Sequence, residues 1–406
     1  MSDDLLKQLR AESEAMREAL VAVRRDLHQH PELAFQELRT ASIVADHLQA
    51  LGYEVQTGVG KTGVVGLMEG TRQSERPLTL LLRFDMDALP IQEEVDVPFK
   101  STYEGKMHAC GHDAHTAVGL GVAELLARHR NRWGGTVKLV FQPAEEIVAG
   151  ALAMIQDGVL ENPKPDRTLS LHMWAEEEVG CIGVTDGAAL AASAAFSVTV
   201  RGRGAHGAAP HLGADPVVAA AHIITALQTI VARNVSPLEA GVVTVGSIHG
   251  GTAPNIIPDA VELRGTLRAF KEELMQRLRE RTKAVVEQVA AAMGVYAEWR
   301  LLSSTPPTVN DPSAATLMRE LAAQLVGPEN VRADYRTMGA EDCSFFLQAA
   351  PGAYVFVGAG NKAKGYTEPH HSPRFQIDED ALPLAVTLLT AGAMRMLDHG
   401  STSAAH

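Results

Sequence analysis

Apolar runs of strand length that alternate with helical segments constrain the fold of this chain more than any other feature. Three such runs cover positions 62–70, 78–87 and 135–146, and a helical pattern over 115–130 separates the last two. Strands that are apolar along nearly their whole length are typical of a mostly parallel sheet with helices on both faces. We therefore predict an α/β fold with a mixed, mostly parallel sheet, whose ligands bind beyond the carboxyl ends of the strands.

The pattern changes near residue 190, after which strands and helices follow the order strand, helix, strand, strand, helix, strand. This is the order of the split βαβ (ferredoxin-like) unit, a self-contained module of about this size. We therefore predict an inserted domain at 191–303, between two parts of a catalytic domain at 1–190 and 304–406. Single helices are predicted over 3–29 and over 215–234.

Composition and charge exclude several classes of protein. The 406 residues include 36 Lys and Arg against 49 Asp and Glu, which gives a formal net charge of −13. This balance disfavours nucleic acid or an anionic membrane as a partner. No apolar run approaches the ~18 residues of a membrane span, and the charged start of the chain lacks the apolar core of a signal peptide. Three cysteines cannot form a disulfide framework, so we expect a cytoplasmic protein.

The densest cluster of reactive side chains is MHACGHDAH, at positions 107–115. It offers His108, Cys110, His112, Asp113 and His115 just before a predicted helix. Thiolate, imidazole and carboxylate are the usual ligands of transition metals. A buried thiol beside helix-capping residues would explain the same motif without a metal.

A second cluster, FQPAEE, places Glu145 and Glu146 at the end of an apolar strand. Adjacent carboxylates at a strand end point in different directions, so one can bind metal while the other moves protons. A solvated loop is the alternative interpretation. The sequence has further candidates near other strand ends or in a Gly/Pro-rich loop, namely Asp85, Asp87, His172, His370 and His371. If all converge, one Cys, one Glu and three His suffice for two ions, which polarise a carbonyl and supply hydroxide near neutral pH.

The predicted inserted domain contains polar candidates of its own. These are His206 and His211 in RGRGAHGAAPH, Asn255 in GGTAPNIIPD and Arg268 in RGTLRAF. Glycines around His206 allow the backbone to approach a ligand closely. Alternatively, His206 and Arg268 are ordinary surface residues of a four-stranded sheet.

Eight motifs cover nearly the whole chain and resemble, in their order, one known family. They are RRDLHQHPELAFQE (24–37), RFDMDALP (83–90), MHACGHDAHTA (107–117), FQPAEE (141–146), RGRGAHGAAPH (201–211), GGTAPNIIPD (250–259), TMGAEDCSFF (337–346) and HHSPRF (370–375). The set resembles the co-catalytic metallo-amidohydrolases of peptidase family M-twenty. The most similar branch contains hippurate hydrolase, N-acyl-L-amino-acid amidohydrolases and the plant indoleacetyl-amino-acid hydrolases.

The resemblance implies a role for each matching residue. Two divalent ions, variously zinc, manganese, cobalt or nickel in the family, would be held by Cys110, His112, Glu146, His172 and His371. His371 is preferred to His370 because it directly precedes Ser-Pro, as the family's ligand does. Glu145 would be the general base, and Asp87 would orient a metal ligand. His206 would stabilise the oxyanion, commonly across a dimer interface. Asn255 and Arg268 would hold the substrate's carboxylate or a nearby oxygen.

The resemblance implies hydrolysis of the amide bond of N-acyl or N-aroyl amino acids, with the inserted domain as a lid and dimerisation domain. A dipeptidase, a carboxypeptidase or an N-carbamoyl amino acid hydrolase on the same scaffold is the alternative. Two further hypotheses remain from the residues: Cys110 as a thiol nucleophile with His112 as its base, and a metal-binding protein without catalysis. The open edge of a four-stranded sheet favours a homodimer or a higher oligomer. We expect a small-molecule substrate and neither nucleic acid nor a membrane as partner.

Overall fold

The computed structural model describes residues 3–398, and the chain forms two compact units. Unit 1 joins the residues up to Ala189 with Val309–Arg336 and the residues from Asp342 onward. Unit 2 comprises Leu190–Thr308 and Thr337–Glu341. Unit 2 is therefore an insertion into unit 1. It extends beyond residue 303 to Thr308 and also includes the separate segment Thr337–Glu341.

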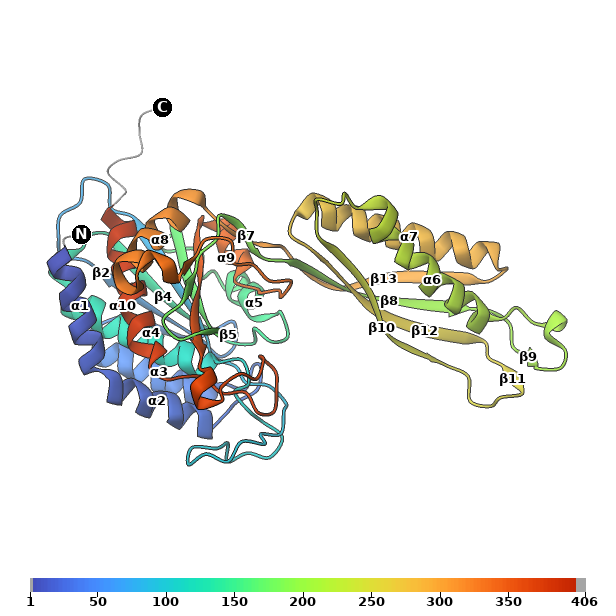
Figure 1. Ribbon diagram of the computed structural model, residues 1–406, viewed down its shortest axis with the longest axis horizontal. Helices are drawn as coiled ribbons and strands as arrows, with labels where there is room; N and C mark the ends of the chain where they lie inside the picture. Colours follow the sequence, from blue (N-terminus) through green and yellow to red (C-terminus); the bar gives the residue numbers. More distant parts are fainter. Residues whose placement is uncertain (1–2, 399–406) are drawn as a thin grey trace. The chain divides into compact units, whose positions relative to one another are not determined.

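An eight-stranded mixed sheet forms the centre of unit 1 (Figure 1). In sheet order the strands are β1 (Glu54–Val59), β2 (Gly63–Glu69), β4 (Thr136–Gln142), β3 (Thr79–Asp85), β5 (Arg167–Glu178), β16 (Gly352–Gly360), β6 (Ile182–Gly183) and β15 (Val331–Arg332). The four central strands β4, β3, β5 and β16 are parallel to one another. β1 and β2 pair antiparallel at one edge. The predicted mixed, mostly parallel sheet is confirmed.

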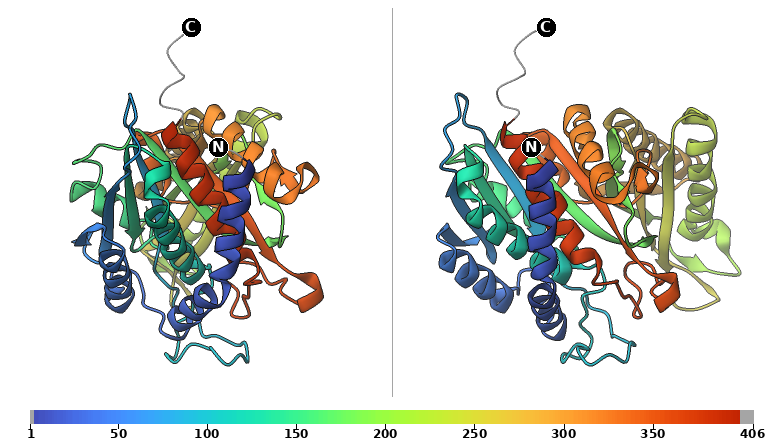
Figure 2. Two further views of the ribbon diagram at one scale, coloured as in Figure 1. Left: turned by 90° about the vertical axis from the view of Figure 1, so that its left-hand side faces the viewer. Right: turned by 60° about the vertical axis from the view of Figure 1, so that its left-hand side comes forward.

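Within residues 3–398, eight α-helices surround this sheet. They are α1 (Asp3–Ala15), α2 (Arg17–Gln29), α3 (Leu38–Ala50), α4 (His112–Arg128), α5 (Gly150–Gln156), α8 (Pro312–Val326), α9 (Ser344–Ala349) and α10 (Ala381–Asp398). The first and the last, α1 and α10, lie side by side (Figure 2). The prediction of one helix over 3–29 is wrong, because the helix breaks at Met16. The Met16 N–H donates to both Glu12 O and Ser13 O, and this tighter turn has no glycine or proline to announce it.

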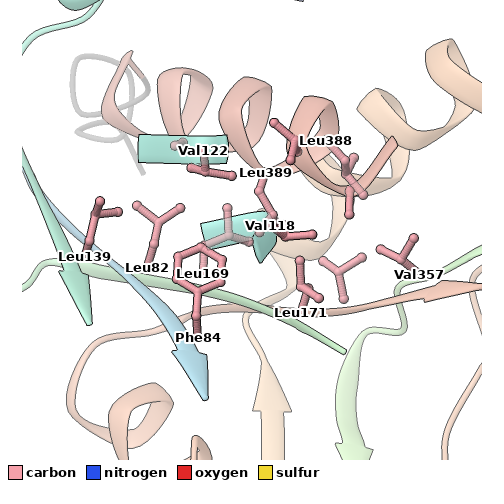
Figure 3. Close-up of a cluster of buried hydrophobic side chains, with 14 of the residues drawn as sticks. Leu82, Phe84, Val118, Val122, Leu139, Leu169, Leu171, Val357, Leu388 and Leu389 are labelled. Atoms are coloured by element: carbon pink, nitrogen blue, oxygen red, sulfur yellow. The ribbon is translucent and has the colours of Figure 1, made fainter. Parts of the chain in front are cut away.

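The main core of unit 1 lies between the sheet and the pair α4 and α10. Figure 3 shows side chains of both helices above side chains of four strands, and these comprise Val118, Val122, Leu388 and Leu389 over Leu82, Phe84, Leu139, Leu169, Leu171 and Val357. The helix comes close to the sheet because Gly119 has no side chain: a Cβ there would lie 2.7 Å from both Phe84 and Phe141. Burying apolar surface on this scale is the main stabilising contribution to the fold.

The carboxyl ends of the parallel strands form the edge at which polar residues gather. Asp85 ends β3 and Gln142 ends β4, directly before the PAEE segment. The first residue of α4, His112, belongs to the same region, because its Nδ1 lies 2.9 Å from the carbonyl oxygen of Asp87. His172 lies within β5, which continues to Glu178, rather than at the end of a strand.

Unit 2 has the strand and helix order of the split βαβ unit. Along the chain the elements are β8 (Ala192–Arg201), α6 (Pro216–Asn234), β10 (Gly241–Gly250), β12 (Ala260–Ala269), α7 (Glu272–Ala292) and β13 (Tyr296–Thr305). The sheet order is β10–β12–β8–β13, and α6 and α7 cover one face (Figure 1). Side chains of β8 alternate accordingly, with Phe196, Val198 and Val200 buried against the helices. The predicted ferredoxin-like architecture is confirmed.

Several short elements complete the chain. A two-stranded sheet of β9 (Ala205–His206) and β11 (Ile256–Ile257) belongs to unit 2, and β7 (Gly187–Leu190) pairs with β14 (Thr308–Asn310). Single 3-10 turns occur at η1 (Arg130–Arg132), η2 (Pro210–Leu212), η3 (Pro328–Asn330) and η4 (Lys362–Lys364).

The expectation that no apolar stretch approaches membrane-span length is wrong. Within residues 3–398, α6 and α10 are both long and apolar enough to cross a membrane, judged by length and composition alone. Polar residues such as His222, Thr225 and Gln228 in α6, and Thr387 and Thr390 in α10, interrupt the apolar runs, so the length of the runs alone did not indicate these helices. In α10, 83% of the apolar window is buried, as befits a core helix of unit 1. In α6 only 33% is buried, so this helix has an exposed face with few charges.

Candidate metal centre

A sharp turn before α4 brings Cys110 and His112 to the carboxyl edge of the sheet. Gly111 stands between them with φ 91°, in the left-handed region that favours glycine. The turn lets His112 open the helix while Cys110 remains in the preceding loop. Both side chains are buried.

Five predicted ligands converge here as two overlapping triplets. In the first, the donor atoms of Cys110, His112 and His172 all lie within 4.8 Å of one another. In the second, the same holds for Cys110, Glu146 and His371. Because Cys110 belongs to both, its sulfur is the point where the two triplets meet.

Hydrogen bonds turn the two buried imidazoles toward this centre. His112 Nδ1 lies 2.9 Å from Asp87 O and 3.2 Å from Asp87 Oδ1, and His172 Nδ1 lies 2.9 Å from Met173 O. These carbonyl partners require a proton on Nδ1 and leave Nε2 as the electron-pair donor, which is the usual arrangement of histidines that bind metals. The Nε2 of His172 lies 3.5 Å from Cys110 Sγ.

Two buried atoms at the centre have no hydrogen-bond partner among the described residues. They are His112 Nε2 and Glu146 Oε1, which lie 3.9 Å apart. A buried polar atom without a partner costs free energy, roughly 1–3 kcal/mol each. A cation between an imidazole nitrogen, a thiolate and a carboxylate oxygen would satisfy both atoms, so this set of residues fits a divalent metal.

The electrostatics of the centre favour positive charge. Burial alone lowers the pKa of His112, but the carboxylates of Asp85, Asp87 and Glu146 raise it to about 10. Burial raises the pKa of Glu146, while the bond to His371 and the charge of His112 lower it below its ordinary value. The field that holds a proton on an imidazole here would equally hold a metal ion.

A strained loop presents Glu145 and Glu146. Ala144 has φ 53°, which is unusual for a residue with a side chain. Its N–H donates to Glu37 Oε1 over 2.9 Å, and Glu146 N–H donates to Asp87 Oδ2 over 3.0 Å. Asp87 thereby contacts both His112 and the Glu146 backbone, as expected for a residue that orients ligands. The Glu145 carboxylate is buried and lies within 4.8 Å of ligand atoms of both His112 and Glu146.

The His370–His371 doublet divides between two surroundings. His371 Nε2 lies 3.3 Å from Glu146 Oε2, and the His371 N–H donates to Ala109 O over 2.8 Å, with the residue at φ 67°. The His370 ring instead stacks on Trp174, with centroids 4.4 Å apart, and its Nε2 lies 3.1 Å from Met173 O. This geometry supports His371, rather than His370, as the residue that faces the centre.

The remaining predicted site residues belong to unit 2. His206 pairs with Ile256 across the β9–β11 ladder, and Gly207 N–H donates to Asn255 O over 2.8 Å, so His206 and Asn255 lie together. Arg268 lies near the other end of the sheet, opposite Ser193, whereas Ala260 at the near end lies opposite Arg201. Arg268 lies eight positions along β12 from Ala260, about 27 Å at ~3.4 Å per position. Within unit 2, Arg268 is thus not brought together with His206 and Asn255.

Three further buried residues shape the centre. The sequence indicated Asp85 and His115 only as candidate metal ligands and assigned no role to Glu37. Glu37 holds the PAEE loop through Ala144, and Asp85 and His115 contact each other at 2.5 Å. Each stands in a motif quoted above, so the signal was present. Their partners come from distant segments, however, and a linear motif does not reveal which backbone group a side chain will meet.

Comparison with known proteins adds independent evidence. Residues 81–395 match a family model described as Peptidase family M20/M25/M40. The chain is 40% identical over 388 residues to the N-acetyl-L-cysteine deacetylase of Bacillus subtilis, an alignment that covers 95% of this chain and 89% of that protein. It is 37% identical over 385 residues to Thermostable carboxypeptidase 1 of Saccharolobus solfataricus, with 94% and 96% covered.

A solved structure has the same fold over nearly its whole length. The YXEP protein of Bacillus subtilis, described as a dinuclear metal binding peptidase from the M20 family, matches with a TM-score of 0.82 and 35% identity. The match covers 95% of this chain and 99% of the YXEP chain.

Proposed function

We propose that this chain, which belongs to peptidase family M20/M25/M40, is a metal-dependent hydrolase that cleaves the amide bond of N-acyl amino acids. The products would be a carboxylic acid and a free amino acid. One observation carries the proposal: two ligand triplets share Cys110, with the buried Glu145 carboxylate directly beside them. Unit 1 would be the catalytic domain and unit 2 the lid and dimerisation domain.

The proposed chemistry assigns the residues of the centre to binding and to proton transfer. Two divalent ions held by Cys110, His112, Glu146, His172 and His371 would supply Lewis acidity toward the carbonyl and lower the pKa of water. Glu145 would take a proton from the attacking water and deliver it to the leaving nitrogen. His206 would donate a hydrogen bond to the carbonyl oxygen as negative charge develops there, as an oxyanion-hole donor does.

The surroundings of Arg268 favour a substrate that carries a carboxylate. Its side chain is partly buried, and burial lowers the pKa of its guanidinium, yet the group stays cationic. Among residues 3–398, no carboxylate forms a salt bridge or hydrogen bond with this guanidinium. A partly desolvated cation without an anionic partner suits the α-carboxylate of an amino acid, which a guanidinium can bind through two hydrogen bonds. The relative named as a deacetylase of N-acetyl-L-cysteine suits the same class of substrate.

Peptide hydrolysis is the second candidate, and the relative named as a carboxypeptidase favours it. The metal centre does not distinguish an acyl group from an aminoacyl group, because the scissile amide is the same. N-carbamoyl amino acids also carry such an amide. The walls of the acyl pocket therefore decide among the three classes.

A substrate panel on protein of measured metal content tests the proposal. The panel should contain N-acetyl-L-cysteine, N-acetyl-L-methionine, N-benzoylglycine, a dipeptide, a C-terminally blocked dipeptide and an N-carbamoyl amino acid. We expect the highest kcat/KM on an N-acyl or N-aroyl amino acid, and loss of activity on amides without the carboxylate. A preference for dipeptides would move the function to the peptidase class, and inactivity on every member would refute the proposal.

We further propose a homodimer formed through unit 2. β10 is an edge strand of its sheet, and it carries no Lys, Arg, Asp or Glu between Gly241 and Gly250. The neighbouring helix α6 exposes Val218, Ala221 and Thr225 on a face without charge. An unpaired edge strand beside an uncharged helix face is a surface that pairs with a second copy. We also propose, as the family resemblance implies, that His206 in the β9–β11 sheet of unit 2 acts on the partner subunit's metal centre.

Mixing two inactive variants tests the dimer and the action of His206 together. Glu145→Gln chains lack the proposed base, and His206→Ala chains lack the proposed oxyanion donor. If His206 acts across the interface, half of the randomly mixed dimers gain one complete site, so about a quarter of wild-type activity should return. If His206 acts within its own chain, or if the protein is a monomer by light scattering, no activity returns on mixing.

The cytoplasm remains the compartment we propose. Among residues 3–398, no disulfide bond involves Cys110, Cys181 or Cys343. A metal-binding thiolate persists best where thiols are kept reduced.

A further inference from the structure

A third group of possible metal ligands lies beside the two that share Cys110. It consists of Asp85, His112 and His115, whose donor atoms also lie within 4.8 Å of one another. All three side chains are buried. By residue type alone this group could bind an ion. Whether it can do so depends on whether hydrogen bonds already occupy the lone pairs that a metal would need.

Both ring nitrogens of His115 are already engaged. The backbone N–H of Met173 donates to His115 Nε2 over 2.8 Å. A backbone N–H can only donate, so Nε2 carries no proton and its lone pair is in use. The proton of a neutral ring is then on Nδ1, which lies 2.5 Å from Asp85 Oδ1. No lone pair of His115 is left for a metal.

Asp85 is held in turn by a buried cation. Arg83 Nη1 donates to Asp85 Oδ2 over 2.5 Å, and Arg83 Nε donates to Gln142 Oε1 over 2.8 Å. Arg83 Nη2 also donates to Asp342 Oδ1 over 3.1 Å. All of these groups are buried, so Arg83 holds the Asp85 carboxylate in place, where it can accept a hydrogen bond from His115 Nδ1–H.

The hydrogen bonds that link Arg83, Asp85 and His115 end at Met173, next to a predicted metal ligand. Met173 directly follows His172, so the bond from Met173 N–H fixes the backbone of β5 at the point where His172 leaves it. The ring of His115 also packs edge-on against that of His172, with centroids 4.6 Å apart, and lies 5.3 Å from that of His112. His115 therefore contacts both imidazoles of the first triplet.

We propose that His115 is a positioning residue, not a ligand: with its tautomer set by Asp85, it holds β5 at Met173 and thereby fixes His172 for metal binding. The proposal rests on the proposed function only in taking Cys110, His112 and His172 as ligands of one ion. The group of Asp85, His112 and His115 then holds no ion of its own, so substitution of His115 should not change the number of ions bound.

Two substitutions of His115 distinguish the contact of its Nε2 with Met173 from the contact of its Nδ1 with Asp85. In His115→Gln, the amide oxygen can still accept from Met173 N–H, whereas in His115→Asn only the contact with Asp85 can persist. We expect zinc affinity to fall about 10- to 100-fold in His115→Asn, the range for partners that orient metal ligands, and less in His115→Gln. Both variants should still bind two zinc ions per chain at saturation, as measured by equilibrium dialysis.

Asp85→Asn provides a second test that does not alter the histidine. An asparagine amide can donate to His115 Nδ1, which would move the ring proton to Nε2 and set it against Met173 N–H. We expect a similar loss of zinc affinity and an altered visible spectrum of the cobalt-loaded protein. His129→Asn is the matched control, because His129 closely follows α4, is also buried and contacts Glu12 instead.

The outcomes are distinct from those of the substrate panel, since metal affinity is measured without substrate. A His115→Asn protein that saturates at one zinc ion fewer than wild type would show that His115 is a ligand. Wild-type zinc affinity in folded His115→Asn and Asp85→Asn proteins would show that the chain of hydrogen bonds has no role in positioning. Either result overturns the proposal.

Discussion

Cys110→Ser is expected to lose most of its bound metal at both positions, and turnover should fall on the order of 10³-fold or more, as removal of Lewis-acid stabilisation worth several kcal/mol implies. The reason is the position of the sulfur, which belongs to both ligand triplets. A serine hydroxyl has similar size but is a poor ligand for transition metals. His172→Ala, which affects one triplet only, should lose one ion and keep the other. Metal content by elemental analysis and rates on an N-acyl amino acid check both expectations.

Cys181→Ser is the matched control for this prediction. Cys181 is a free, partly exposed thiol of unit 1, next to β6 and in neither triplet. The control should keep two ions and the wild-type rate. If Cys110 is instead a thiol nucleophile, Cys110→Ser would lose turnover while keeping two ions. That outcome would contradict the shared-ligand assignment and favour covalent catalysis.

Glu145→Gln is expected to retain two ions while kcat falls about 10²- to 10⁴-fold, the usual contribution of a general base. The substitution keeps the volume of the buried side chain but removes its negative charge and its ability to accept a proton. Glu146→Gln offers a matched comparison, because the two residues are adjacent and chemically identical. Glu146 lies in a ligand triplet, so its substitution should lower metal content as well as rate.

Glu69→Gln controls for the loss of one negative charge from unit 1. Glu69 is exposed at the end of β2 and should tolerate the change without effect on rate or metal content. Wild-type turnover in Glu145→Gln would remove the assigned base. Loss of metal in that variant, with Glu146→Gln unaffected, would exchange the roles of the two carboxylates.

Much of the fold could be predicted from the sequence, because its pattern has a direct physical meaning. Strands that are apolar on both faces require cover on both faces, which predicted the parallel centre of the sheet and the helices around it. The break at Met16 could not be foreseen, since it depends on backbone hydrogen bonds to Glu12 and Ser13 rather than on residue type. The span-length helices α6 and α10 were missed because single polar residues hide their overall apolar character.

At the candidate centre, too, the sequence indicated the types of residue present but not the partners that they contact. The sequence indicated Cys110, His112 and Glu146 by ligand chemistry and family resemblance. It did not indicate that His115 would meet the backbone of Met173, 58 residues away. Nor did it indicate that Glu37 would hold Ala144, 107 residues away. Residue types can be listed from a sequence, but hydrogen-bond partners of buried groups are decided by how distant segments pack.

Stepwise return of metal to metal-free protein tests the central claim most directly. The chain should be stripped with a chelator, shown to remain folded, and given zinc or manganese while hydrolysis of an N-acyl amino acid and bound metal are measured together. The dinuclear assignment predicts no turnover without metal, and a rate that reaches its maximum at two ions per chain. Full turnover in metal-free protein, or a maximum at one ion with no second ion bound, would contradict it.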